Sequence, residues 1–322
     1  ISAHGELLII GQCTGPACGW TFVAFKNSTT MTYRPIERVI APGQPHFVGD
    51  GFRVHNFIPH GASVSMERMS PFIMLDYNSK WQVPAANSPR GVGVHPHRGF
   101  ETVTIAYKGK VAHHDSSGGG GVISEGDVQW MTAASGVLHK EYHEEEFSKH
   151  GGIFQMVQLW VNLPSKDKMS TPKYQAIAHE KMAQHQLPDG SGAIEVIAGN
   201  YNGTQGPATT FTPVHMYNAR LSAGGTADFE FPSNYNTSLL VVEGAIRVNG
   251  TENVPTDHFV LLANEAGTIT IEATGPAVVL VLSGEPINEP IAAHGPFVMN
   301  TQDEIRQAMH DFNQGKFGYL ED

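Results

Sequence analysis

The sequence predicts an all-β fold that ends in one short helix. Glycine and proline recur along the whole chain, which contains 35 and 20 of them, and long helical patterns are scarce. Between these turn signals lie short runs rich in Val, Ile, Thr and aromatic residues. The clearest strand candidates are residues 101–107, 128–132, 154–161, 239–242 and 277–282. Short strands separated by frequent turns are typical of β-sandwiches and β-barrels.

The strand candidates fall into two blocks, from about residue 32 to 163 and from about residue 193 to 283. Segment 164–172, PSKDKMSTP, is polar and begins and ends with proline, so we interpret it as a connector. We therefore predict an N-terminal domain at 31–172 and a C-terminal domain at 173–322. The two blocks share a sequence pattern, in which a polar segment is followed by an apolar strand, a glycine turn and a second strand. This shared pattern suggests that the blocks are internal copies.

The clearest helix candidate lies near the C-terminus. Thr301 and Glu304 form a capping-box pattern, in which the threonine accepts from the third helical amide and the glutamate reaches back. The apolar residues that follow recur at helical spacing and share one face: Ile305, Ala308, Met309 and Phe312. Gly315 supplies a stop. We expect this helix to pack on a barrel.

The first thirty residues differ from the rest of the chain. Both cysteines, Cys13 and Cys18, lie there, and Met31 opens a segment that reads like a natural start. No positively charged region precedes the apolar residues 5–12, so we do not expect a signal peptide. We interpret residues 1–30 as a non-native or disordered extension. The absence of cysteine from the remainder fits a reducing, cytoplasmic location.

Charge and hydropathy exclude two classes of partner. Lys and Arg number 20 against 31 Asp and Glu, for a net charge of −11, and no basic block stands out. A nucleic-acid partner is therefore not expected. No apolar run approaches the length of a membrane span, so we expect no membrane partner either.

Two short motifs about forty residues apart carry metal-capable side chains. His95 and His97 flank a proline, and His139 and Glu141 flank a lysine. On a strand, residues i and i+2 project from the same face. If the two strands lie side by side, three imidazoles and one carboxylate converge. Such a set suits a divalent transition metal such as iron, with positions left open for substrate or oxygen.

The second block keeps the strand pattern but lacks these ligands. Asn234, Tyr235 and Asn236 stand where the first block has its first two histidines, and no histidine occurs at the end of segment 257–272. We therefore predict one metal site, in the N-terminal domain only.

Several stretches together resemble the pirin family and its bacterial relatives with quercetin dioxygenase activity. HPHRGFETV, GDVQWMTA and GVLHKE, at residues 95–103, 126–133 and 136–141, carry the resemblance. It is extended by SPFIMLD at 70–76, QLWVNLP at 158–164 and GEPINEPIAAHGPFVMN at 284–300. The resemblance covers nearly the whole chain from about Tyr33 to Gly318, and residues 1–30 fall outside it.

The resemblance implies two cupin (jelly-roll) β-barrels in one chain, a bicupin, with metal in the N-terminal barrel. The family's ligands fall on His95, His97, His139 and Glu141. Fe(II) is the expected metal, and Mn, Ni, Cu, Co or Zn are alternatives. Glu101, four residues after His97 and on the same strand face, is the rival carboxylate, which the family pattern leaves beside the ligands rather than among them.

Three further histidines need an interpretation. His113 and His114 precede a glycine-rich loop on a different strand, and we predict that they are not ligands. His143 sits among glutamates 144–146, and we predict that it is exposed to solvent.

Three functions remain open. The first is a dioxygenase that cleaves a flavonol with O2, with Glu141 as the catalytic proton acceptor. The second is an iron- or redox-responsive regulator that binds a transcription factor or a metabolic enzyme without turnover. The third is a storage or structural bicupin with incidental metal. We expect a monomer in each case.

Overall fold

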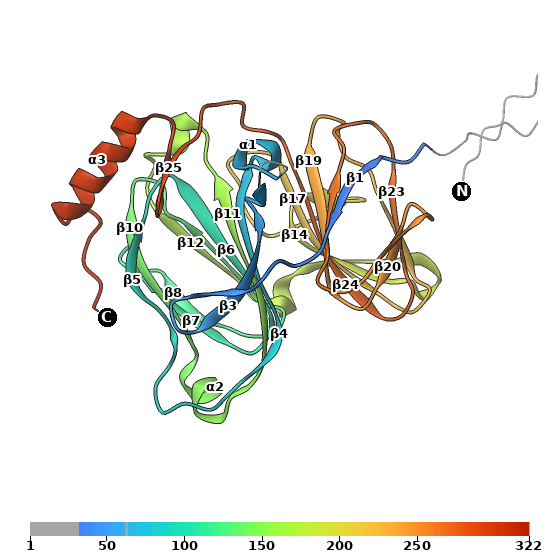
Figure 1. Cartoon of the computed structure of the whole chain (residues 1–322), viewed down its shortest axis with the longest axis horizontal. Coiled ribbons are helices and arrows are strands. Elements are labelled where there is room, and N and C mark those ends of the chain that lie inside the picture. The colour runs from blue at the N-terminus through green and yellow to red at the C-terminus, as the bar shows by residue number, and fades with distance from the viewer. Residues whose placement is uncertain (1–31, 62–63, 322) are drawn as a thin grey trace, which may run out of the picture.

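A computed structural model of the chain describes residues 32–61 and 64–321. The predicted extension at 1–30 lies outside the described residues. Two β-sandwiches lie side by side, and the described residues include three short α-helices (Figure 1). Each sandwich combines a seven-stranded sheet with a four-stranded sheet. The predicted all-β fold with two barrels in one chain is confirmed.

The N-terminal barrel is formed mainly by the first half of the chain. Its large sheet contains, from edge to edge, β12 (Lys173–Ile177), β9 (Val128–Thr132), β6 (Phe100–Lys108), β11 (Gly152–Asn162), β4 (Phe72–Val83), β3 (Phe52–Ile58) and β2 (His46–Val48). Its small sheet contains β5 (Gly91–His97), β10 (Val137–His143), β7 (Val111–Asp115) and β8 (Gly120–Ile123). The strands predicted at 101–107, 128–132 and 154–161 are present as β6, β9 and β11.

The C-terminal barrel repeats this arrangement. Its large sheet contains β1 (Ile36–Ile40), β22 (Phe259–Leu262), β19 (Asn236–Glu243), β24 (Ala277–Gly284), β17 (Val214–Leu221), β14 (Gly192–Ala198) and β13 (Ala183–Gln186). Its small sheet contains β18 (Thr226–Phe229), β23 (Ile269–Ala273), β20 (Ile246–Val248) and β21 (Glu252–Val254). When the strand orders of the two barrels are aligned, β6 corresponds to β19 and β10 corresponds to β23. The shared topology supports the interpretation of the two blocks as internal copies.

The two barrels exchange their edge strands. Strand β1 precedes the N-terminal barrel in sequence, yet it pairs with β22 of the C-terminal barrel. Strand β12 follows the connector, yet it pairs with β9 of the N-terminal barrel. The domain limits at 31–172 and 173–322 stay a prediction, and these pairings place one strand from each range in the other range's sheet.

The remaining elements are short. The helices are α1 (Met66–Met69), α2 (Glu145–His150) and α3 (Gln302–Asn313), and 3-10 turns occur at Ser165–Asp167, His179–Lys181 and Pro188–Gly190. Two small hairpins pair β15 (Asn200–Tyr201) with β16 (Thr204–Gln205) and β25 (Ala292–His294) with β26 (Phe297–Met299). None of the helices in the described residues is long and apolar enough to span a membrane.

Helix α3 has the predicted capping box. Thr301 Oγ1 accepts from the Glu304 amide at 3.2 Å, and Glu304 Oε2 accepts from the Thr301 amide at 2.8 Å. The helix follows the C-terminal barrel in sequence but lies against the outer side of the N-terminal barrel (Figure 1). It is held there by a buried ion pair between Arg98 and Asp311 at 2.9 Å. The last part of the chain therefore packs directly behind the first histidine motif.

The two barrels differ in what fills them. An apolar cluster that includes Tyr217, Val241, Ile246 and Ile271 fills the C-terminal barrel. The corresponding cluster in the N-terminal barrel, which includes Phe52, is smaller. Buried polar side chains occupy the rest of that interior. Because buried polar groups are costly unless they have partners, this half of the barrel is where a functional site is expected.

Candidate metal centre

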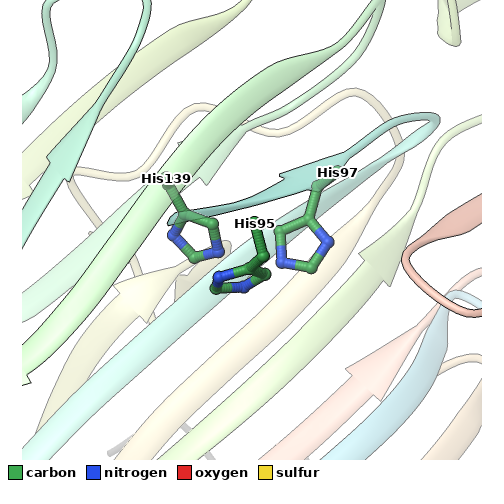
Figure 2. A group of neighbouring side chains, drawn as sticks. All are labelled: His95, His97 and His139. Carbon is green, nitrogen blue, oxygen red and sulfur yellow. The ribbon is translucent and has the colours of Figure 1, made fainter. Parts of the chain in front are cut away.

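Three imidazoles meet where strands β5 and β10 run side by side. The strands are antiparallel, with His139 opposite His95 and Val137 opposite His97. The ring centroids are 4.2 Å apart for His95 and His139, 4.6 Å for His97 and His139, and 4.8 Å for His95 and His97. Figure 2 shows the three rings converging from the two strands. The i and i+2 spacing therefore places these side chains together, as the strand geometry predicts.

The cluster is largely removed from solvent, and its buried members are neutral at physiological pH. His97 is 3% exposed and His139 is fully buried, whereas His95 is partly exposed. Burial, followed by the neighbouring imidazoles, lowers the pKa of His97 and of His139 well below the usual value. A neutral imidazole keeps one nitrogen lone pair, which is the form that binds a metal.

The hydrogen bonds in the cluster leave nitrogen atoms free to act as ligands. Gly93 O accepts from His95 Nδ1 at 2.8 Å, and Pro296 O accepts from His97 Nδ1 at 3.4 Å. The Nε2 atom of His139 is buried and has no hydrogen-bond partner among the described residues. Buried polar atoms normally have a hydrogen-bond partner or a bound ligand, so a bound partner is expected at this nitrogen. Three clustered imidazoles, one with a buried and unpartnered Nε2, fit a divalent transition metal.

Glu141 lies two residues beyond His139 on β10 and is 4% exposed. Its Oε1 accepts from Gln129 Nε2 and from Thr104 Oγ1, the latter at 3.1 Å, and its Oε2 accepts from Gln158 Nε2 at 3.0 Å. These donors hold the carboxylate in the barrel interior. It forms a possible metal-binding group with His113 and His139 rather than with all three clustered imidazoles. Its assignment as the fourth ligand stays a prediction.

His113 is closer to the site than the sequence interpretation expects. It is fully buried on β7, its Nδ1 lies 3.4 Å from His139 Nδ1, and its ring stacks on Tyr174 with centroids 5.2 Å apart. His114, the next residue, points outward and is exposed. One sequence signal could have indicated this inward position. His113 and Asp115 are also spaced i and i+2 on a strand, so they share a face. The prediction that His113 and His114 are not metal ligands is not tested by this geometry.

Asp115 continues the polar group away from the clustered imidazoles. Its Oδ2 lies 3.2 Å from His113 Nε2, and its side chain is fully buried. Burial acts to raise the pKa of this carboxyl, but hydrogen bonds from His113, Ser117 and Gly119 outweigh it and lower the pKa to about 2. Asp115 is therefore an anion at neutral pH.

Glu101, the rival carboxylate, belongs to neither possible metal-binding group. It is 1% exposed on β6 and accepts from Thr132 Oγ1 at 2.7 Å. Burial raises its pKa to about 7, against the hydrogen bond from Thr132. That Glu101 lies beside the ligands rather than among them stays a prediction.

The prediction that His143 is exposed is wrong. The side chain is 1% exposed and packs against Phe52, Phe147 and Phe154. Strand β10 continues as far as residue 143, so the strand alternation turns His143 to the same interior as His139 and Glu141. Burial lowers its pKa to about 4.

The equivalent positions of the C-terminal barrel are apolar. Strand β23 directs Ile269, Ile271 and Ala273 inward, and β18 directs Ala227 and Phe229 inward. Both possible metal-binding groups found among residues 32–61 and 64–321 lie in the N-terminal barrel. That a single metal site exists, in the N-terminal barrel only, stays a prediction.

Two stacked jelly-roll barrels with clustered imidazoles in one of them define a bicupin with a candidate metal centre in its N-terminal barrel. The family models described as "Pirin" and "Pirin C-terminal cupin domain" match residues 51–161 and 216–318. The chain belongs to the pirin family.

Relatives and solved structures agree with this membership. A Pseudomonas aeruginosa protein provisionally named a quercetin 2,3-dioxygenase is 47% identical over 84% of this chain and 94% of its own length. A pirin-like protein of Solanum lycopersicum is 35% identical over 88% of this chain and 92% of its own length. The crystal structure of a quercetin 2,3-dioxygenase from Acinetobacter baumannii is 45% identical, with a TM-score of 0.83, and the match covers 90% of this chain and all of that one.

Proposed function

We propose that this protein is a metal-dependent dioxygenase that opens the heterocyclic ring of a flavonol such as quercetin with O2. The observation that carries the proposal is the cluster of His95, His97 and His139, in which the last two are buried and His139 Nε2 has no partner among the described residues. The quercetin 2,3-dioxygenase names of two relatives support the reaction class. We place the protein in the cytoplasm as part of this proposal.

The three imidazoles and Glu141 would hold the metal, with Fe(II) as our first choice and Mn, Ni, Cu, Co or Zn compatible with the same donors. The bound metal would act as a Lewis acid that lowers the pKa of the substrate hydroxyl, and iron would add redox chemistry with O2. The protein supplies the orientation. The backbone acceptors Gly93 O and Pro296 O orient the rings of His95 and His97 through Nδ1, which leaves the Nε2 atom of each ring for the metal.

Glu141 is the residue to which we assign acceptance of the substrate's hydroxyl proton. Oε1 already accepts two hydrogen bonds, from Gln129 and Thr104, whereas Oε2 accepts one, from Gln158. A carboxylate oxygen has two lone pairs, so one lone pair remains, on Oε2. It can bind the metal or take the proton but not both at once, so Glu141 has to release the metal or one of its hydrogen bonds when it accepts the proton. Gln129 and Gln158 also hold the carboxylate in place, which keeps the acceptor at a fixed position.

Aromatic side chains bound the site on the side of His97. Phe100 and Trp160 stack on each other with centroids 4.2 Å apart and lie 5.0 Å and 5.3 Å from the His97 ring. Such a wall excludes water and offers apolar contact to a flat aromatic ligand.

The burial of the imidazoles favours a second candidate, a regulator that holds metal and binds a transcription factor or metabolic enzyme without turnover. His97 and His139 are almost inaccessible to solvent. A cavity of about 330 Å³ lies in the C-terminal barrel, where Tyr201, Tyr217 and Phe231 contribute to its lining. A closed site can sense metal but admits a ring-sized substrate only after movement.

The test is oxygen uptake by anaerobically iron-loaded protein after quercetin is added. We expect uptake with release of carbon monoxide by the wild type, and at least a 100-fold loss of turnover together with most of the bound metal in His139→Ala. The exposed neighbour of His113 provides the matched control, so His114→Ala should keep both. Full activity in His139→Ala would refute the site. A wild type that holds one iron per chain but takes up no oxygen would favour the regulator.

A further inference from the structure

The arrangement around Asp115 determines where one hydrogen of His113 lies. Oδ1 of Asp115 accepts from the Ser117 amide at 2.8 Å, from Ser117 Oγ at 2.6 Å and from the Gly119 amide at 3.0 Å. These donors form a tight turn and leave Oδ2 for His113 Nε2 at 3.2 Å. An ionised carboxylate only accepts hydrogen bonds, so the Nε2 atom of His113 carries the hydrogen.

The opposite nitrogen of His113 then determines the tautomer of His139. A neutral imidazole that carries hydrogen on Nε2 has a lone pair on Nδ1. That Nδ1 faces His139 Nδ1 at 3.4 Å. Two facing nitrogens form a hydrogen bond only if one donates and the other accepts, so His139 Nδ1 carries the hydrogen. The lone pair of His139 is left on Nε2, the buried atom without a partner among the described residues.

We propose that Asp115 and His113 form a hydrogen-bond relay that fixes His139 in its Nδ1–H tautomer and so keeps Nε2 available as a metal ligand. The consequence for metal binding rests on the metal centre of the proposed function, whereas the tautomers do not. His113 and Asp115 are positioning residues, because they act through His139. Tyr174 holds the plane of the His113 ring by stacking on it, with an interplanar angle of 15°.

The relay also explains how a fourth histidine can lie in the group without being a ligand. In the relay the lone pair of His113 Nδ1 accepts the hydrogen of His139 Nδ1, 3.4 Å away, whereas Glu141 Oε1, at 4.0 Å, is itself an acceptor and does not bond to that lone pair. A metal bound by His113 would need that same lone pair. The two uses exclude each other, and the tests below separate them.

The first test reads the tautomers in the metal-free protein by nitrogen-15 NMR of the histidine rings. In the wild type we expect hydrogen on Nε2 of His113 and on Nδ1 of His139. Asp115→Asn keeps an oxygen for the turn donors but presents an amide N–H to His113, so both tautomers should reverse. A wild-type His113 with hydrogen on Nδ1, or unchanged tautomers in Asp115→Asn, would overturn the relay.

The second test reads metal affinity with Co(II) as the probe, followed through its visible ligand-field spectrum. Changes to groups that orient a metal-binding histidine typically cost 10- to 100-fold in affinity, and we expect a loss of about that size in Asp115→Asn. His113→Phe keeps the stacking on Tyr174 but removes the acceptor, so it should lose as much. His113→Gln restores an acceptor oxygen and should recover part of the loss. Loss of one ligand's spectral contribution in both His113 variants, with Asp115→Asn unaffected, would make His113 a ligand and overturn the relay.

Asp127 supplies the matched control for Asp115. It is also a turn carboxylate of the N-terminal barrel, and its Oδ2 accepts from the amide and the hydroxyl of Ser124 at 2.9 Å and 3.1 Å. It contacts none of the clustered imidazoles, so Asp127→Asn should bind Co(II) within about twofold of the wild type. An equal loss of affinity in Asp127→Asn would mean that turn disruption, not the relay, weakens the site.

Parallel oxygen-uptake measurements separate this proposal from the proposed function. If the tautomers and affinities follow the expectation and the wild type does not consume oxygen with quercetin, the dioxygenase proposal fails and the relay stands. If the wild type consumes oxygen and Asp115→Asn matches it in tautomers and affinity, the relay fails and the dioxygenase proposal stands.

Discussion

At the scale of single residues, the N-terminal barrel concentrates ionisable groups in positions that hold them in defined protonation states. Burial keeps His97, His139 and His143 neutral, whereas local donors keep Asp115 ionised. Glu101 is the exception, since burial raises its pKa to about 7 and its charge changes near physiological pH. The barrel interior therefore gains one negative charge when Glu101 loses its proton.

Glu101 should make the stability of the protein depend on pH. Its pKa of about 7 lies above the value of 4.5 for an unperturbed glutamate, because burial disfavours the ion. The folded state binds this proton more tightly than the unfolded state does. The contribution of Glu101 to the free energy of unfolding is therefore fully present below pH 4.5 and is lost as the pH rises to 7. At 1.36 kcal/mol per pKa unit, this loss is about 3 kcal/mol. Glu101→Gln should remove that part of the pH dependence, measured by urea unfolding of the metal-free protein at several pH values.

The control for this prediction is the same exchange at an exposed glutamate, Glu252→Gln. Glutamine at residue 101 can still accept from Thr132 Oγ1, so the local hydrogen bond is kept. A Glu101→Gln variant whose free energy of unfolding falls with pH as steeply as that of the wild type would contradict the assignment.

Sequence reasoning finds the residues whose signal is local and misses those whose position depends on where a strand ends. The i and i+2 spacing is enough to bring His95, His97 and His139 together. His143 follows the same alternation, but three glutamates after it suggest a surface loop, and the sequence does not show that β10 extends so far. His113 and Asp115 have the same i and i+2 spacing, but their place beside His139 depends on the pairing of β7 with β10, which that spacing alone does not reveal.

At the scale of elements, helix α3 is attached to the back of the first histidine motif. Arg98 follows His97 directly, donates to Ser135 O at 2.7 Å and pairs with Asp311 at 2.9 Å. The guanidinium carbon also lies 4.6 Å from the centre of the Phe317 ring. Because Arg98 is 4% exposed, its charge depends on Asp311 for compensation.

Removing the carboxylate from this pair should be costly. Asp311→Ala leaves the Arg98 guanidinium buried without its partner, and breaking a buried pair in this way typically costs 3–5 kcal/mol. We expect a loss of about that size in the free energy of unfolding, measured by urea denaturation. Asp303→Ala on the same helix removes the carboxylate of an exposed pair with Arg306 and should have little effect. Equal, small losses in both variants would show that α3 does not depend on the Arg98 pair.

The elements themselves are predictable to the extent that their signals are local. The capping box and the apolar spacing locate α3, and alternation with turn signals locates β6, β9 and β11. The exchange of β1 and β12 is not predictable in this way, because the pairing partners lie more than forty residues away in sequence.

The connector at residues 164–172 is also more firmly held than its polar composition suggests. Its Lys168 is 1% exposed and donates to Gly99 O, Asn162 Oδ1 and Val298 O.

At the scale of the whole molecule, the two seven-stranded sheets share one apolar core. Phe57 of the N-terminal barrel stacks on Phe259 of the C-terminal barrel, with centroids 5.4 Å apart. Polar contacts also cross the interface. Tyr77 Oη donates to Asp257 at 2.7 Å, and Tyr107 Oη donates to Asn218 at 2.7 Å. Together with the exchanged strands, this core indicates that the barrels fold and unfold as one unit.

The tryptophans allow that cooperativity to be tested. All three tryptophans in the described residues, Trp81, Trp130 and Trp160, lie in the N-terminal barrel, whereas circular dichroism reports strands of both barrels. Ile271→Ala creates a cavity inside the C-terminal barrel, and such changes cost about 2–5 kcal/mol. If the molecule unfolds as one unit, the midpoint of the tryptophan fluorescence transition in urea must move as far as the circular dichroism midpoint. A fluorescence midpoint that stays at the wild-type value while circular dichroism shifts would mean that the barrels unfold independently.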